Sequence, residues 1–212
     1  MSDAVSSPGL PRRVRAAALV CVLLAGFVGC SSASEAMGLS RLSDLASEPA
    51  PNWGNFADKA ALSALTDAYV KAMSAQRGTR GVILVLLAFA AAITFVAGAR
   101  FLRPLGLPRE GLRRLLVWGS TVAAVLRVVD GAQMAAVARR IGATAQTVFQ
   151  GQSPAEISAM ATLRPLLPSL YVAGTAGLTV VIAGTFAFLA SYFNAASVKS
   201  AIRAHDERAR PG

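Results

Sequence analysis

Two residues of opposite charge, Arg127 and Asp130, lie inside a stretch from Leu115 to Ala138 that is otherwise uncharged. This stretch has 24 residues, which is enough to span a bilayer, and Arg127 lies beside its midpoint. An ionisable residue within a membrane span is energetically costly and marks a candidate functional site. The i, i+3 spacing places both side chains on neighbouring faces of a helix, about 4.5 Å apart along its axis. We therefore expect an ion pair.

Three interpretations of this pair are open from the sequence. The pair is a structural polar lock that holds helices together, a polar site for ions, protons or partners, or a sign that the span boundary is misplaced. Asp130 is the only acidic residue in any predicted span, so a relay of protons along several groups is not expected. Several copies of the chain around one axis would be needed to gather more carboxylates.

Residue types that serve catalysis or metal binding are otherwise scarce. His205 is the single histidine and lies in the polar C-terminal tail, while Cys21 and Cys30 both lie in the first hydrophobic block. The sequence contains no zinc-peptidase motif, no cluster of cysteine with histidine and no glycine loop of the phosphate-binding type. We therefore expect no enzymatic activity, no cofactor and no metal site.

Four apolar blocks determine the expected fold. Apolar residues make up 54% of the 212 residues and charged residues only 15%. The blocks are each near the length of a membrane-spanning helix and comprise residues 16–34, 81–99, 115–138 and 170–193. The sequence therefore predicts an all-α, polytopic membrane protein, a four-helix transmembrane bundle with short extracytoplasmic helices.

The first block allows two outcomes. Three arginines in residues 1–15 precede an apolar run, as in a secretory signal. The following sequence, Phe27-Val28-Gly29-Cys30-Ser31-Ser32, resembles a bacterial lipoprotein processing site, which implies cleavage before Cys30 and lipidation of that residue. The alternative is a signal anchor that is retained as the first span, with its helix continuing to about Ser34.

Basic residues predict the topology. The loop 100–114 between the second and third spans contains five arginines, and short basic loops remain cytoplasmic. Residues 1–15 and the tail 194–212 are then also cytoplasmic if the first span is retained, whereas the loops 35–80 and 139–169 are extracytoplasmic. We expect a cell membrane of the bacterial inner type. The formal net charge of +10 indicates anionic lipid headgroups as partners rather than nucleic acid, since no basic patch with interleaved aromatics is present.

The extracytoplasmic loops are each expected to contain one helix. In the first loop, residues 56–76 carry an apolar stripe with helical spacing, formed by Leu62, Leu65, Tyr69 and Met73. This stripe caps the bundle or rests on the membrane surface, or it is a docking face for a partner helix. In the second loop, Ser153 and Glu156 have the spacing of a capping box, which predicts a short helix over residues 154–163.

Small residues in the last span predict close helix packing. Ala173 and Gly177, and then Ala183 and Ala187, are spaced at i, i+4, which lets helices approach closely in lipid. Together these patterns predict a small non-catalytic membrane protein, an assembly, accessory or sensing subunit that contacts other membrane proteins. The alternative is a small homo-oligomeric channel or transporter subunit that uses Arg127 and Asp130 as a polar pore site.

Overall fold

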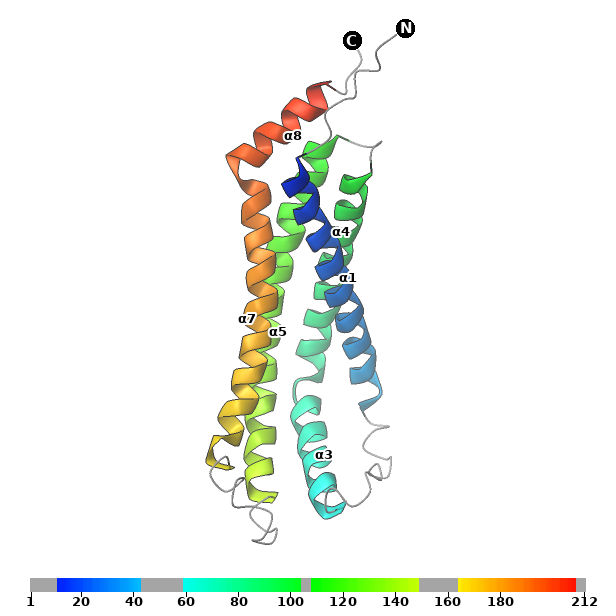
Figure 1. Cartoon of the computed structure of the whole chain (residues 1–212). Helices are drawn as coiled ribbons and strands as arrows, with labels where there is room; N and C mark the ends of the chain where they lie inside the picture. Colours follow the sequence, from blue (N-terminus) through cyan, green and yellow to red (C-terminus); the bar gives the residue numbers. More distant parts are fainter. Residues whose placement is uncertain (1–10, 43–58, 104–107, 149–163, 209–212) are drawn as a thin grey trace. The chain divides into compact units, whose positions relative to one another are not determined.

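The computed structural model describes residues 11–42, 59–103, 108–148 and 164–208, and all regular structure in these residues is helical (Figure 1). The elements are α1 (Arg12–Ser40), α3 (Lys59–Ser74), α4 (Arg77–Leu102), α5 (Arg109–Val148), the 3₁₀ turn η4 (Arg164–Leu166), α7 (Leu167–Asn194) and α8 (Ala196–Arg208). Helices α1, α4, α5 and α7 are each long and apolar enough to cross a membrane. The chain is a multi-pass, all-α membrane protein, as predicted.

Each predicted span lies within one of these four helices, but the helices are longer than the spans. Helix α1 continues without a break past Cys30 to Ser40, and α5 extends beyond the predicted span at both ends. Helix α3 lies inside the predicted range 56–76. The tail contains a helix, α8, that was not predicted. The helix predicted over residues 154–163 lies outside the described residues.

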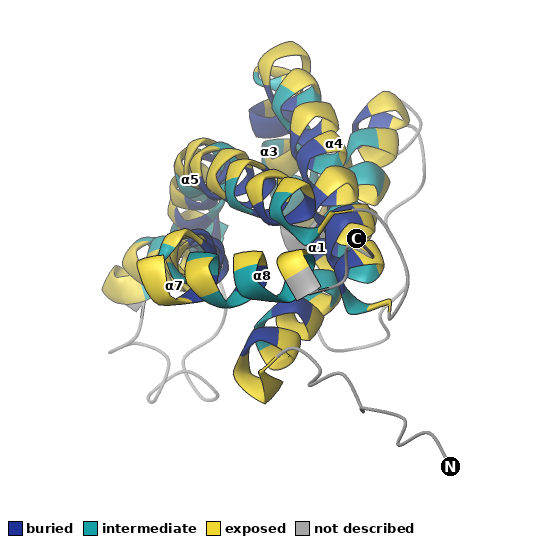
Figure 2. Ribbon diagram, turned by 90° about the horizontal axis from the view of Figure 1, so that it is seen from above, coloured by how far each residue is buried: buried dark blue, intermediate teal, exposed yellow. Residues whose placement is uncertain are grey.

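The chain divides into two compact units, and the four long helices each contribute to both. The first unit comprises Met1–Cys30, Leu87–Val125 and Ala183–Gly212, and the second comprises Ser31–Leu86 and Leu126–Ile182. Along each long helix, buried residues alternate with exposed ones (Figure 2). Exposed apolar residues are numerous on all four helices, as expected for surfaces that contact lipid.

The core of the first unit is apolar and includes residues of α1, α4, α5, α7 and α8. Ala18 and Cys21 of α1 are fully buried beside Leu116 of α5 and Phe193 of α7. The close approach of α5 to α4 depends on Gly119, because a Cβ at this position would clash with the Thr94 side chain. Because Ala18 and Cys21 belong to this core, α1 is an integral part of the first unit.

Helix α8 is attached to the first turn of α5 within the first unit. The backbone N–H of Glu110 donates to Asp206 of α8 at 3.1 Å. Close by, Arg113 Nη1 donates to the carbonyl of Phe193 at the end of α7 at 3.0 Å. Arg113 is buried and also donates to Glu110 through Nε and Nη2. These hydrogen bonds lower the pKa of Glu110 to about 2, since they favour its charged form.

The second unit has a smaller apolar core beneath the end of α1. It comprises Leu39, Leu42, Ala72, Met73, Leu84 and Val137. Of the stripe predicted on α3, Met73 is buried in this core, Leu65 is partly buried and Tyr69 is exposed, while the side chain of Leu62 lies outside the description. The C-terminal end of the α3 stripe thus packs inside the chain.

The close packing of α7 in the second unit depends on glycines of α5. A Cβ on Gly131 would clash with Thr179, and one on Gly142 would meet the backbone of Pro168. These two glycines are eleven residues apart, about three helical turns, so they lie on the same face of α5. The stripe predicted on α7 behaves differently: Ala183 is buried, but Ala173, Gly177 and Ala187 are exposed. Small size permits close approach, but the partner helix decides which face is used.

Candidate functional site

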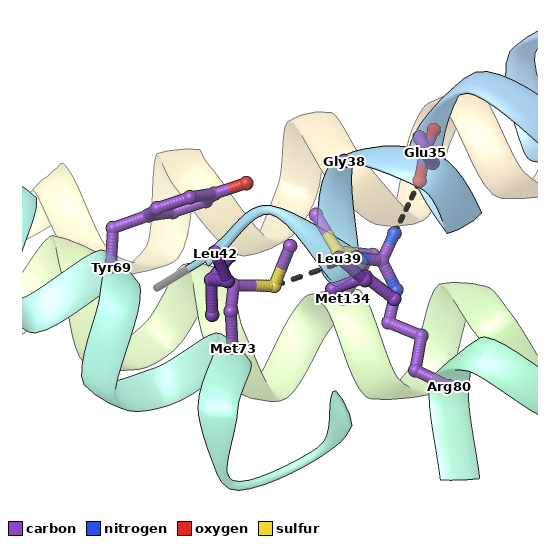
Figure 3. Close-up of a pocket in the computed structure, with 8 residues that line it drawn as sticks. All are labelled: Glu35, Gly38, Leu39, Leu42, Tyr69, Met73, Arg80 and Met134. Carbon is purple, nitrogen blue, oxygen red and sulfur yellow. Dashed lines mark hydrogen bonds and ion pairs between the residues drawn. The ribbon is translucent and has the colours of Figure 1, made fainter. Parts of the chain in front are cut away.

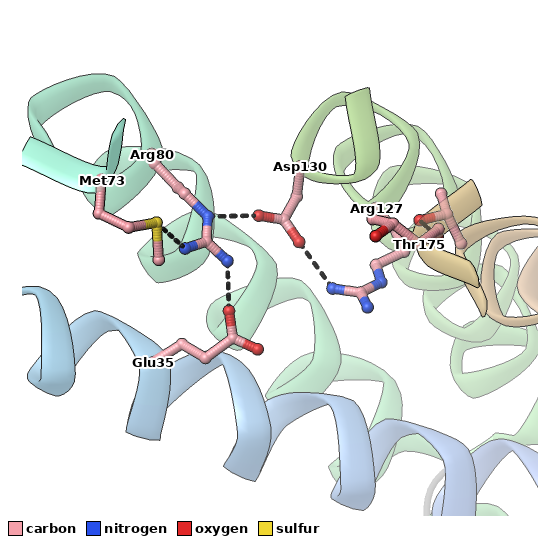
Figure 4. Close-up of polar contacts among 7 residues, drawn as sticks. Glu35, Met73, Arg80, Arg127, Asp130 and Thr175 are labelled. Carbon is pink, nitrogen blue, oxygen red and sulfur yellow. Dashed lines mark hydrogen bonds and ion pairs between the residues drawn. The ribbon is translucent and has the colours of Figure 1, made fainter. Parts of the chain in front are cut away.

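A buried guanidinium group, that of Arg80 on α4, connects three elements of the second unit (Figure 4). Its Nε donates to Asp130 Oδ1 on α5 at 3.1 Å, and its Nη2 donates to Glu35 Oε2 on α1 at 2.5 Å. Its Nη1 lies 3.4 Å from the sulfur of Met73, which precedes Arg80 by seven residues and belongs to α3. The residue is only 1% exposed, so almost all of its charge is compensated by protein groups.

The second carboxylate in this network, Asp130, is fully buried and uses both of its oxygens. Oδ1 accepts from Arg80, and Oδ2 accepts from Arg127 Nη1 at 2.6 Å. The i, i+3 spacing therefore produces the expected ion pair, but Asp130 has a second partner on another helix. The four residues Glu35, Arg80, Asp130 and Arg127 form a row of alternating charge, called the charge chain below, and their formal charges sum to zero.

The charge chain lies where the apolar segments of α1 and α4 end. Glu35 follows Arg15 by twenty residues in α1, and Arg100 follows Arg80 by twenty residues in α4, each about 30 Å of helix. That length matches the hydrocarbon thickness of a bilayer. Because Asp130 is hydrogen-bonded to Arg80, Asp130 lies at the same depth as the ends of these apolar segments. The midpoint of residues 115–138 is therefore a poor guide to the depth of Arg127 and Asp130.

A cavity of about 310 Å³ adjoins the charge chain in the second unit. All four charged residues line it, together with Gly131, Met134, Gly174, Thr175, Leu178 and Thr179. The Thr175 hydroxyl donates to the Tyr171 carbonyl at 2.9 Å, and the Thr179 hydroxyl donates to the Thr175 carbonyl at 2.9 Å. Their oxygen lone pairs remain as acceptors.

A second cavity, of about 330 Å³, lies on the α3 side of the charge chain (Figure 3). Its walls are mostly apolar and are formed by Leu39, Leu42, Tyr69, Met73 and Met134, with Gly38. Glu35 and Arg80 line this cavity as well as the first one. The Glu35–Arg80 ion pair thus borders both spaces.

The two ends of the charge chain differ from its middle. Glu35 uses one carboxylate oxygen for Arg80, and its side chain remains 43% exposed. At the other end, the Arg127 side chain is 15% exposed, and its buried Nε has no hydrogen-bond partner among the described residues. A buried donor without an acceptor is unusual and calls for an explanation such as an unseen water or ligand.

The remaining chemistry-bearing residues lie apart from the charge chain. His205 lies in α8 of the first unit, with its ring nitrogens 3.0 and 3.4 Å from Arg109 Nη1. Cys21 is buried in the first unit, and Cys30 lies on an exposed face of α1. In the described ranges, no group of three or more histidine, cysteine or acidic residues could hold a metal ion.

Sequence reasoning identified Arg127 and Asp130 but missed Glu35 and Arg80. Both missed residues had been assigned to a loop flanking the predicted spans. A signal for them exists in the sequence, because each lies directly at the end of an uncharged segment of spanning length. Comparison of the chain with protein-family models, with curated proteins and with solved structures finds no match.

Proposed function

We propose that this chain is a non-catalytic, multi-pass membrane protein that serves as an assembly, accessory or sensing subunit of a membrane complex. The observation that carries the proposal is the burial of Asp130 between two arginines, each of which donates to one of its oxygens. A catalytic or proton-carrying carboxylate must be reached by a substrate group or by water. Asp130 instead joins α4 to α5, which supports a structural role for the middle of the charge chain.

The exposed surface of the long helices supports contacts in the membrane. Large apolar side chains are exposed on each of these helices, for example Phe27, Phe89, Trp118 and Phe188. Exposed apolar faces of this kind contact lipid or the helices of other membrane proteins. We propose that both termini are cytoplasmic, with the five arginines of residues 100–114 on that side.

Retention of the first helix belongs to the same proposal. Cleavage before Cys30 would remove Ala18 and Cys21, which are fully buried in the first unit. Loss of two such residues together with their helix would expose much of the core around Leu116. We therefore favour the retained signal anchor over the lipoprotein outcome.

The alternative function is a small homo-oligomeric channel or transporter subunit. In that function, Asp130 from several copies would face a common pore. Asp130 is fully buried within one chain, which gives this alternative less support.

Mass measurement of the protein in native membrane nanodiscs tests the proposal. We expect a heteromeric assembly of fixed stoichiometry that conducts no ions after reconstitution into liposomes. A solitary monomer would contradict the assembly role. A homo-oligomer that conducts ions, and loses conductance in Asp130→Asn, would establish the channel instead.

A further inference from the structure

The cavity beside the charge chain has room for a small ligand. Its volume of about 310 Å³ corresponds to roughly ten water molecules at about 30 Å³ each. Gly174 and Leu178 in its wall are exposed, so the space opens to the surface of the helices and a ligand can enter it. The size falls at the lower limit of pockets that bind small molecules, which is about 300 Å³.

The charges around the cavity restrict what it can bind. Two arginines and two carboxylates line it, so the formal charge of its wall is zero. A lone anion or a lone cation would leave an uncompensated charge beside the buried Arg80 and Asp130, which is costly. A ligand that carries one positive and one negative group preserves neutrality.

The ends of the charge chain supply the matching contacts. Arg80 and Asp130 are occupied by one another and by their neighbours, but Glu35 and Arg127 are not fully used. Glu35 offers a half-exposed carboxylate, and Arg127 has an Nε–H without an acceptor among the described residues. Both residues line the same cavity, and in Figure 4 they approach the same space from α1 and α5.

We propose that this cavity binds a small zwitterion, with its ammonium group at Glu35 and its phosphate group at Arg127. Charge-assisted hydrogen bonds to a carboxylate and a guanidinium are among the strongest available in a protein. Gly174 leaves space in the wall of the cavity, since a Cβ there would meet no atom within 4 Å.

The ligand chemistry is an aminoalkyl phosphate, which has two sources. The charge chain lies at the ends of the apolar segments of α1 and α4, where lipid headgroups are found. A phosphatidylethanolamine headgroup and free glycerophosphoethanolamine carry the same pair of charged groups, one ammonium and one phosphodiester. This inference names the ligand of a sensing subunit, and in that respect it rests on the proposed function.

The test measures thermal stability of the full chain in nanodiscs made from phosphatidylglycerol alone. Glycerophosphoethanolamine is added as the soluble probe, and ethanolamine and inorganic phosphate are added separately to supply its two kinds of charged group. A parallel sample contains phosphatidylethanolamine in the nanodisc. We expect a concentration-dependent rise in melting temperature with the zwitterion in at least one form, because a ligand that binds only the folded state stabilises it.

Two substitutions on α7 separate binding from folding. Gly174→Leu adds a large side chain to the wall of the cavity without removing a charge, whereas Gly177→Leu adds the same side chain outside the lining; both glycines are exposed. We expect Gly174→Leu to weaken the apparent affinity for the zwitterion by about tenfold or more, because displacement of the ligand would break one or two charge-assisted hydrogen bonds. Gly177→Leu should change it by less than about twofold.

Each outcome has a defined meaning. A rise with phosphatidylethanolamine only identifies a lipid ligand, and a rise with soluble glycerophosphoethanolamine identifies a site for the free compound. An equal rise with inorganic phosphate alone, or no rise with any probe, overturns the zwitterion site. Failure of this test leaves the mass of the native assembly unaffected, so the proposed function fails or stands separately.

Discussion

Substitution of Asp130 by asparagine tests whether the charge chain is a closed network. The change keeps the shape of the side chain but removes its negative charge. Arg80 still has Glu35, whereas Arg127 loses its only carboxylate partner among the described residues. The single variant therefore leaves a largely buried positive charge without compensation.

The expected cost follows from the burial of both partners. Breaking a buried ion pair by removing one partner costs about 3–5 kcal/mol of folding stability. Arg127 keeps a side-chain exposure of 15%, and asparagine can still accept a hydrogen bond, so we expect about 3 kcal/mol. Adding Arg127→Gln removes the stranded charge and leaves the Glu35–Arg80 pair intact. The double variant should lose only about 1 kcal/mol, about 2 kcal/mol less than Asp130→Asn alone and therefore well below the sum of the two single losses.

The assay is reversible unfolding of the detergent-solubilised protein, followed by circular dichroism as the fraction of sodium dodecyl sulfate is raised. Arg114→Gln on the same helix is the control, because its side chain is 68% exposed and its contact with Glu110 is a surface ion pair. The control should lose less than about 1 kcal/mol. An Asp130→Asn loss no larger than the control, or a double variant equal to the sum of the singles, would refute a closed network.

Three further predictions follow from other parts of the chain. Gly131→Ala should destabilise the second unit by about 1–3 kcal/mol through overpacking against Thr179, while Gly177→Ala should not; the same unfolding assay compares them. Intact mass of the membrane-extracted protein should show a retained first helix, and a lipidated terminus at Cys30 would contradict this. The folded-state pKa of Glu110 is lowered to about 2, so its charged form contributes stability that is present above about pH 4.5 and is lost as the pH falls to about 2. Glu110→Gln should remove this contribution. Melting temperatures of the two proteins across this pH range test the sign.

The sequence was sufficient for the spans because hydropathy is a local property. Each apolar block corresponds to one long helix, and the i, i+3 spacing of Arg127 and Asp130 produces an ion pair. Contacts between helices could not be predicted from the sequence, since the contact of Arg80 with Asp130 depends on the register of α4 against α5. Helix α8 was missed because a short amphipathic helix in a charged tail carries no strong hydropathy signal.

The residues that bring helices together show the same limit. Small residues on α7 have the spacing expected for packing, yet Gly177 is exposed and the close contacts use Gly131 and Gly142 of α5. A small residue only permits close approach; whether it is used depends on the larger side chain that faces it. Thr179 and Pro168 occupy that position here.

The position of each residue in the charge chain determines what its substitution should affect. Asp130 is fully buried between Arg80 and Arg127, so a change there disturbs the contact between α4 and α5 and should lower stability. Glu35 is half exposed and can be hydrated when its charge is removed, so Glu35→Gln should cost less stability than Asp130→Asn. The same substitution removes the proposed contact for an ammonium group, so it should abolish stabilisation by the zwitterion. If the charge chain only holds the helices together, the unsubstituted protein should show no stabilisation by the zwitterion, and Glu35→Gln should change stability alone.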